Sequence, residues 1–385
     1  MNQFSILRRR LLTLASGAPL AALLPRGAAA QATGEPIRIG LSAAITGQFA
    51  QNGFYMRNGV TLAVNEVNAA GGVNGRPLKL YVEDDQGPNP TAAVNAMNKL
   101  VNQDEVIATI GPHNTPAVLP VLPMLAQYHV PALTGASGPV VTQQNNPWIF
   151  RMRLNDEIGA ALLVDYMLDK LGCKKIGLAY VSTAFGQGGI KMVHDALVAR
   201  GVQPALEQAH QISIKDFTAN LMAFQQAGVD GVIVWSDDQP AGLFVKQAKT
   251  LGMTFKVAGS TGLSQPAFIA LASDAAEGVM AVTDFSPDNP SPEAKSWIAK
   301  YTAAYKEPPE LFASAYYDAL YILVGAMRRA TAMNGPAIRE ALTKTSGLVG
   351  VTNTYTWTAT GDMVKQGFIT RNVNGKPVIA SVISR

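Results

Sequence analysis

The chain has 385 residues, a formal charge of +4 and an isoelectric point of about 9.0. Residues 1–30 contain four arginines and no acidic residue, so the formal charge of the remaining chain is 0. The basic balance therefore belongs to the N-terminal segment, and no basic footprint for nucleic acid is left after it. One cysteine, Cys173, excludes an internal disulfide.

The first 30 residues predict a secretory signal peptide. Arg8, Arg9 and Arg10 precede an apolar stretch over residues 11–24, and small residues at 28–32 offer a cleavage site. The arginine run fits export by either the general secretory or the twin-arginine route. About 355 residues would remain, which exceeds one comfortable hydrophobic core and predicts two lobes.

From residue 37 onward, short apolar runs alternate with helical segments. The first half predicts strands at residues 37–45, 78–85, 106–112, 130–135 and 148–153, with helices at 56–68, 92–101 and 119–127. The rhythm restarts after residue 153, with strands at 175–181, 203–212, 231–236, 256–261 and 278–285, and helices at 157–170, 189–200, 217–227 and 241–251. Two further helices are predicted at 294–305 and 311–330. This alternation predicts two doubly wound α/β lobes with parallel sheets, separated near residues 151–153.

Four predicted strands end in small or polar residues followed by proline: "GPHNTP", "TGASGP", "SDDQP" and "GLSQP". Such sequences are typical of helix starts, where Ser, Thr, Asp or Asn caps the helix and proline takes its first position. Thr115 before Pro116 fits this pattern as a cap. Because ligands bind beyond the carboxyl ends of parallel strands, these helix starts predict a binding site between the lobes.

Catalytic and metal-binding patterns do not stand out. The sequence lacks a G-x-S-x-G elbow, a phosphate-binding Walker loop and an H-E-x-x-H pair, and its four histidines do not have metal-ligand spacing. The acids Glu83, Asp84 and Asp85 are interpreted as a solvated turn after a strand. We therefore expect a binding protein that is not an enzyme and uses no metal or cofactor.

The order of these segments resembles the periplasmic solute-binding proteins of branched-chain amino acid ABC transporters. The segments that carry the resemblance include "IRIGLSAAITGQFAQNG", "NAAGGVNGRPLKLYVEDDQGPNPTAAV", "IGPHNTPAV", "PALTGASGPVVT", "IFRMRLND" and "GVDGVIVW". The resemblance implies two α/β lobes that are joined by three crossovers and close on a ligand. It places residues 35–153 and 286–357 in one lobe, and residues 154–285 and 358–385 in the other.

The resemblance also implies which residues contact the ligand. Thr115 matches the hydroxyl that contacts a ligand carboxylate, and Ala136, Ser137 and Gly138 match backbone and hydroxyl contacts from the next loop. Phe185 matches an aromatic contact from the second lobe, and residues 235–238 match a further contacting loop.

Three positions depart from the family's pattern for amino-acid ligands. Thr261 stands where an acid normally binds the ligand's ammonium group, Asn52 stands where tyrosine is common, and Asn114 replaces a disulfide cysteine. Asp237 or Asp238, at a neighbouring strand end, could supply the missing carboxylate. Without such a counter-ion a buried ammonium group is costly, so ligands without one are expected to bind more tightly than leucine, isoleucine or valine.

The predicted function is that of a monomeric periplasmic receptor that delivers a small carboxylate, amide or amino acid to a membrane ABC permease. A ligand sensor that works with a membrane or regulatory partner is the main alternative. An exported enzyme on the same fold is a third hypothesis, which lacks a recognisable catalytic set.

Overall fold

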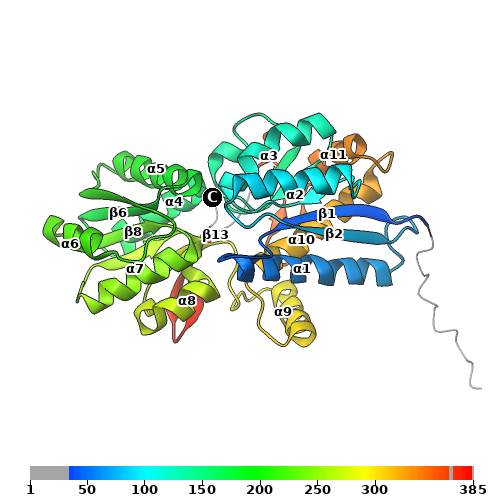
Figure 1. Cartoon of the computed structure of the whole chain (residues 1–385). Helices are drawn as coiled ribbons and strands as arrows, with labels where there is room; N and C mark the ends of the chain where they lie inside the picture. The colour runs from blue at the N-terminus through cyan, green and yellow to red at the C-terminus, as the bar shows by residue number, and fades with distance from the viewer. Residues whose placement is uncertain (1–33, 364–366, 384–385) are drawn as a thin grey trace, which may run out of the picture.

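Two sheets, each covered by helices on both faces, form two lobes that lie side by side (Figure 1). The computed structural model describes residues 34–363 and 367–383, so the predicted signal peptide lies outside the described residues. The expected fold, two doubly wound lobes joined by three crossovers, is confirmed.

The first lobe contains a parallel five-stranded sheet in the order β2-β1-β3-β4-β5. Its strands are β1 (Ile37–Ala43), β2 (Leu78–Asp84), β3 (Thr109–Ile110), β4 (Ala132–Thr134) and β5 (Ile149–Arg151). Its helices are α1 (Ala50–Ala69), α2 (Pro90–Asn102), α3 (Thr115–Tyr128), α9 (Pro292–Tyr305), α10 (Leu311–Arg329) and α11 (Gly335–Thr343). One core packs α1 and α10 on the sheet, and a second core packs α2 and α3 on its other face.

The second lobe has a seven-stranded sheet in the order β14-β13-β10-β9-β8-β6-β7. Its strands are β6 (Ile176–Val181), β7 (Leu206–His210), β8 (Gly231–Trp235), β9 (Lys256–Gly259), β10 (Met280–Thr283), β13 (Gly367–Val373) and β14 (Lys376–Ile383). Its helices are α4 (Asp156–Asp165), α5 (Ala184–Ala199), α6 (Thr218–Ala227), α7 (Asp238–Thr250) and α8 (Pro266–Ala272). Along β8, Val232 and Val234 face one core while Ile233 and Trp235 face the other. A strand that is apolar on both sides is typical of a parallel sheet buried between helices.

The hairpin β13–β14 is a feature that the alternating pattern did not predict. Strand β13 pairs antiparallel with β10, and β14 pairs antiparallel with β13. The C-terminal segment therefore returns to the second lobe after α9, α10 and α11 have completed the first.

Close contact between α1 and α10 depends on a glycine. A Cβ atom added at Gly59 would lie 2.1 Å from the backbone oxygen of Ala313. The two helix backbones can approach this closely only because Gly59 has no side chain. This contact attaches α10, which is late in the sequence, to the first helix of the chain.

Three chain segments cross between the lobes: residues 152–155, residues 284–291 and a third segment that begins near residue 356. Buried arginines link them. Nε of Arg151, at the end of β5, lies 2.6 Å from Oδ1 of Asp362 in the third crossover. Nη2 of Arg153, in the first crossover, lies 2.9 Å from Oδ1 of Asp284 at the start of the second. The second crossover is therefore joined to the first, and the third is joined to the end of β5.

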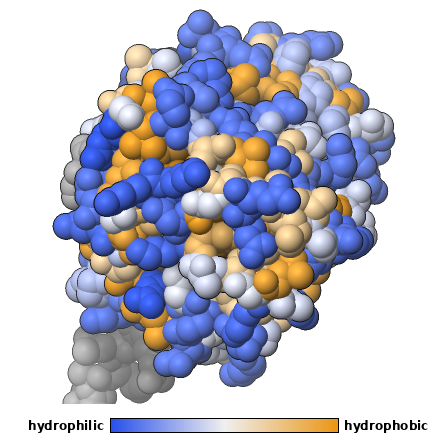
Figure 2. Space-filling view, turned by 90° about the vertical axis from the view of Figure 1, so that its left-hand side faces the viewer, coloured by the Kyte–Doolittle hydropathy of each residue, from blue (hydrophilic) through white to orange (hydrophobic). Residues whose placement is uncertain are grey.

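Polar side chains dominate the outer end of the second lobe, with apolar side chains in small groups among them (Figure 2). Exposed apolar residues of this lobe include Val198, Met222 and Leu251. Among the described residues, no helix combines the length and apolarity needed to cross a bilayer.

Candidate ligand-binding cleft

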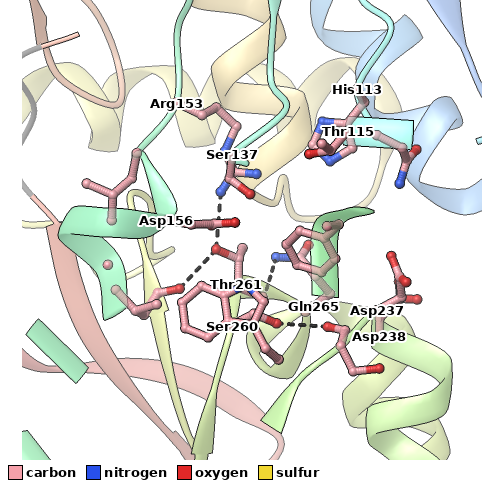
Figure 3. A pocket seen from close by; sticks show the side chains of 18 of the residues that line it. His113, Thr115, Ser137, Arg153, Asp156, Asp237, Asp238, Ser260, Thr261 and Gln265 are labelled. Atoms are coloured by element: carbon pink, nitrogen blue, oxygen red, sulfur yellow. Dashed lines mark hydrogen bonds between the residues drawn. The ribbon is translucent and has the colours of Figure 1, made fainter. Parts of the chain in front are cut away.

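A cleft lies between the lobes where the strands of both sheets end (Figure 3). The first lobe contributes Asn52, His113, Asn114, Thr115, Ser137 and Phe312. The second contributes Phe185, Trp235, Ser236, Asp237, Asp238, Ser260, Thr261, Gly262, Gln265 and Val282. Residues from Arg153 to Asp156 of the first crossover, together with Gly159 of α4, complete the lining. The site therefore lies where parallel sheets usually bind ligands.

The expected contact residues are brought together with two exceptions. Asn52, Asn114, Thr115, Ser137, Phe185, Asp237 and Thr261 all line the cleft, whereas Ala136 and Gly138 do not. The N–H of Ala136 donates to Oγ1 of Thr134 at 3.1 Å, and the N–H of Gly138 donates to Oγ1 of Thr115 at 3.3 Å. Both N–H groups are occupied within the protein, so their expected contact with a ligand carboxylate stays a prediction that this arrangement does not favour.

Thr115 does not act as the helix cap that its position before Pro116 predicts. Helix α3 begins at Thr115 itself, and Asn114 is the N-cap residue, without a side-chain hydrogen bond to the helix. The Thr115 hydroxyl oxygen instead accepts from Gly138 and joins two neighbouring loops. Its proton remains available to donate to an acceptor in the cleft.

The interpretation of residues 83–85 as a solvated turn is wrong for Asp85. This side chain is buried, and its Oδ2 accepts from Ser42 at 2.9 Å while its Oδ1 accepts from the N–H of Gly87. Burial raises the pKa of Asp85 to about 6. Oδ1 of Asp84 accepts from the N–H of Ile45 at 2.8 Å and from the N–H of Thr46. Asp84 thus shapes the β1–α1 loop that precedes Asn52, and Asp85 joins β1 to the loop after β2.

Arg153 reaches the cleft from the first crossover. Nε and Nη2 donate to Oδ1 of Asp284 at 3.2 and 2.9 Å, and Nη2 also donates to Oγ1 of Thr261 at 3.2 Å. The ring of Phe312 lies 5.6 Å from the guanidinium carbon, within the range of a cation–π contact. One edge of the guanidinium is therefore fixed by the protein.

Thr261, at the position where the resemblance expects an acid, holds this arginine. Its hydroxyl accepts from Arg153 and donates to the carbonyl oxygen of Val282 at 2.9 Å. The proton of this hydroxyl is thus already donated within the protein, and this part of the cleft carries the positive group of Arg153.

Two acids stand at the start of α7 and give the second lobe's wall its negative charge. Burial and the neighbouring Asp238 raise the pKa of Asp237 to about 7, and burial also raises the pKa of Asp238. Nδ2 of Asn52 donates to Oδ2 of Asp238 at 3.2 Å. Nε2 of Gln239 donates to the carbonyl oxygen of Gln48 at 2.9 Å. These two hydrogen bonds connect α7 to the first lobe at the edge of the cleft.

The cleft contains carboxyl groups that could serve as the counter-ion of an ammonium group, as the sequence allowed for Asp237 and Asp238. Asp237 and Asp238 both line the cleft. Asp156 lines it too, and burial raises its pKa to about 6. The Oδ2 atom of Asp156 is buried without a hydrogen-bond partner among the described residues.

The histidine and the aromatic residues provide an uncharged wall. Burial, with the nearby charge of Arg153, lowers the pKa of His113 to about 3, so its ring is neutral. This ring packs edge-on against Phe312, with 4.4 Å between centroids. Trp235 is buried beneath α5, where a Cβ added at Gly189 would lie 1.9 Å from its Nε1. Phe185, at the start of α5, is only partly buried.

Comparison with known proteins identifies the family. The profile of the periplasmic binding protein family matches residues 36–376. The chain belongs to this family. It is 30% identical over 334 residues to the Leu/Ile/Val-binding protein BraC3 of Rhizobium johnstonii, covering 86% of this chain and 90% of the relative. The family consists of binding proteins rather than enzymes.

Solved structures share the fold across nearly the whole chain. The branched-chain amino acid transporter substrate-binding protein LivJ of Streptococcus pneumoniae, in complex with isoleucine, has a TM-score of 0.85 at 25% identity, covering 91% of this chain and 100% of that one. A solute-binding protein of an ABC transporter from R. palustris, in complex with benzoate, has a TM-score of 0.83 at 19% identity, covering 91% and 98%. The second similarity concerns the fold alone.

The sequence interpretation missed several residues that line the cleft, among them Arg153, Asp156, Ser260, Gln265 and Phe312. A usable signal existed for Arg153, because "IFRMRLND" places a charged residue where the two series of strands separate. Phe312 lies at the start of α10 and is far in sequence from the other contacts. No local pattern distinguishes it from a core residue.

Proposed function

We propose that the protein captures a small solute in this cleft, outside the cytoplasm, and delivers it to the membrane permease of an ABC transporter. Family membership and the names of the relatives support this role. The observation that carries it is a cleft with one wall from each lobe and the crossovers between them. Such a site can be buried when the lobes rotate toward each other.

We propose an amino acid, with both an ammonium and a carboxylate group, as the ligand class. Asp237 and Asp238 offer counter-ions for the ammonium group, and Phe185 and Phe312 offer apolar surface for a side chain. The hydroxyls of Thr115 and Ser137 offer donors to a carboxylate. The expectation that ligands without an ammonium group bind more tightly stays the alternative, which the comparison of amino acids with their deaminated analogues tests.

Closure provides the signal that the permease would recognise. A ligand shifts the lobes toward the closed form only to the extent that it binds that form more tightly. The hydrogen bonds from Asn52 to Asp238 and from Gln239 to Gln48 form between the lobes, so they exist only when these surfaces meet. They stabilise the closed form together with the ligand.

A thermal-shift screen of the protein without residues 1–30 tests the ligand class. Amino acids, their deaminated analogues, amides, urea and aromatic carboxylates would be compared at equal concentrations. A ligand at 100 times its dissociation constant adds about 2.7 kcal/mol to the free energy of unfolding, and we expect this from at least one aliphatic amino acid. No stabilisation by any amino acid would contradict the proposed class.

Small-angle scattering tests the closing motion independently. Ligand at saturation should reduce the radius of gyration, because the lobes move toward each other. An unchanged radius in the presence of a ligand that raises the melting temperature would exclude the closing mechanism while leaving the binding role.

The organisation of the chain completes the proposal. We propose lobes formed by residues 35–153 with 286–357 and by 154–285 with 358–385, a monomeric state, and a signal peptide removed near residue 30. Mass spectrometry of the protein recovered from the periplasm would give the mature N-terminus, and light scattering would give the oligomeric state.

A further inference from the structure

We propose that Arg153 binds the carboxylate of the ligand through its Nη1 group, which makes a residue of the hinge the anion anchor. This inference rests on the proposed function and names the group that selects for an acidic ligand. Arg153 lies in the first crossover between β5 and α4 and lines the cleft.

The guanidinium already has a fixed orientation. Its Nε and Nη2 are bound by Asp284, and Nη2 also by Thr261, while Phe312 covers its face. The Arg153 side chain is only 4% exposed and that of Asp284 is fully buried. A donor that is held in place and largely removed from water loses little freedom when a ligand binds to it.

Nη1 is the part of the guanidinium that the protein leaves available. Among the described residues, no acceptor is bonded to Nη1, although Nε and Nη2 are both bonded. Because His113 is neutral, Arg153 is the only described lining residue that carries a positive charge near neutral pH. The backbone N–H groups of Ala136 and Gly138 cannot replace it, since both are already bonded to threonine hydroxyls.

The acids near Arg153 do not prevent this contact. Asp284 and Arg153 form an ion pair whose charges balance. Arg153 therefore offers the ligand oriented, charge-assisted N–H groups rather than excess positive charge. Oδ2 of Asp156 is buried and has no hydrogen-bond partner among the described residues, and in its protonated form Asp156 would donate to the same carboxylate instead of repelling it. The remaining acids, Asp237 and Asp238, lie at the start of α7, where they would meet the ligand's ammonium group.

The test compares acids with their amides on normal and substituted protein. The probes are L-leucine with L-leucinamide, and benzoate with benzamide, measured by calorimetric titration on the unmodified protein, Arg153→Gln and Arg153→Lys. We expect the unmodified protein to bind the acid at least tenfold more tightly than the amide in at least one pair. Arg153→Gln should reduce that ratio to below about threefold, and Arg153→Lys should leave an intermediate ratio.

Arg151→Lys is the matched control, because Arg151 is also buried and joins crossovers but does not line the cleft. It should change affinity for acid and amide by the same factor. Melting curves identify any variant that does not fold, and Arg153→Lys keeps the comparison possible if Arg153→Gln is unfolded.

The outcomes separate the two proposals. An acid preference that persists in Arg153→Gln, or equal binding of acid and amide by the unmodified protein, overturns the anchor but leaves the receptor role intact. Failure of all four probes to bind overturns the anchor for these ligands and also counts against the proposed amino-acid class.

Discussion

The two lobes place different chemistry at the same edge of the same kind of sheet. The strand order β2-β1-β3-β4-β5 of the first lobe is repeated by β7-β6-β8-β9-β10 in the second. The first lobe's wall of the cleft is uncharged, with hydroxyls, amides and a neutral His113. The second lobe's wall carries Asp237 and Asp238. Strand order thus determines where a site forms, whereas the residues at the strand ends determine what it can bind.

The two walls of the cleft face each other because the crossovers hold the lobes together. Among the substitutions considered, Arg151→Ala should therefore have the largest effect on stability. The change leaves the carboxylate of Asp362 without its buried partner. Breaking such a pair on one side costs about 3–5 kcal/mol. Chemical denaturation should show this loss, and substitution of the exposed Arg200 should change the free energy of unfolding by about 1 kcal/mol or less. If Arg151→Ala lowers the free energy of unfolding by no more than this, the ion pair between Arg151 and Asp362 has no structural role.

Removing the negative charge of the second wall should have the next largest effect. Asp237→Asn should weaken binding of an amino acid by about 1.5–3 kcal/mol, the usual value of a hydrogen bond to a charged group. Binding of the deaminated analogue should change far less. Asp274→Asn, on an 82% exposed side chain, is the control and should leave both affinities unchanged. Equal losses for both ligands would show that Asp237 does not meet the ammonium group.

The pH dependence of ligand affinity should also distinguish the second lobe's wall, which carries Asp237, from the uncharged wall of the first lobe. An ammonium group needs ionised Asp237, whose pKa is about 7 in the ligand-free protein. Affinity for an amino acid should therefore rise by about tenfold between pH 6 and pH 8, measured by titration in buffers of matched ionic strength. This rise should disappear in Asp237→Asn.

The Asp237 carboxyl should also affect the stability of the ligand-free protein. A rise in pH should increase the affinity for an amino acid but lower the free energy of unfolding. Between its ordinary pKa and the raised one, the folded chain binds more protons than the unfolded chain. The contribution of Asp237 to the free energy of unfolding should therefore fall as pH rises from about 4 to about 7. Melting temperatures of Asp237→Asn, compared with those of the unmodified protein across this window, isolate the contribution.

The uncharged wall should respond most weakly to substitution. Thr115→Ala removes a neutral donor to the ligand and the acceptor for the Gly138 N–H. Each loss should be near 1 kcal/mol, the usual net value of a neutral hydrogen bond. Titration and melting curves separate the two, with Thr343→Ala, an exposed residue of α11, as the control. If only stability falls, Thr115 joins the two loops without contacting the ligand.

The location of the cleft followed from the sequence because parallel strands bring their carboxyl ends to one edge. The strand-end pattern placed Thr115 and Asp237 near this edge, and the family resemblance singled out Thr115 and Thr261 as positions of ligand contact. The role of Thr261 could not be found, because its partner Arg153 lies 108 positions away. The occupied N–H groups of Ala136 and Gly138 depend on threonine side chains whose directions no local pattern shows.

The C-terminal hairpin was missed for a related reason. Strand β13 pairs with β10, about 90 residues earlier, and follows a long segment in which the alternation of strands and helices breaks down. Its pairing with β10 and β14 is antiparallel, whereas the pattern predicted parallel strands only. A regular pattern along the chain predicts neighbouring elements and carries little information about a strand that is added last.

Arg151 at the end of β5 and Arg153 in the first crossover connect this part of the chain to the other two crossovers. Arg151 pairs with Asp362 and Arg153 pairs with Asp284, so the third crossover is held at the end of β5 and the second is held at its start by the first. A lobe movement that separated either pair would leave a buried charge without its partner, which costs several kcal/mol. Movements that keep both pairs intact are therefore expected to cost less free energy than movements that break them.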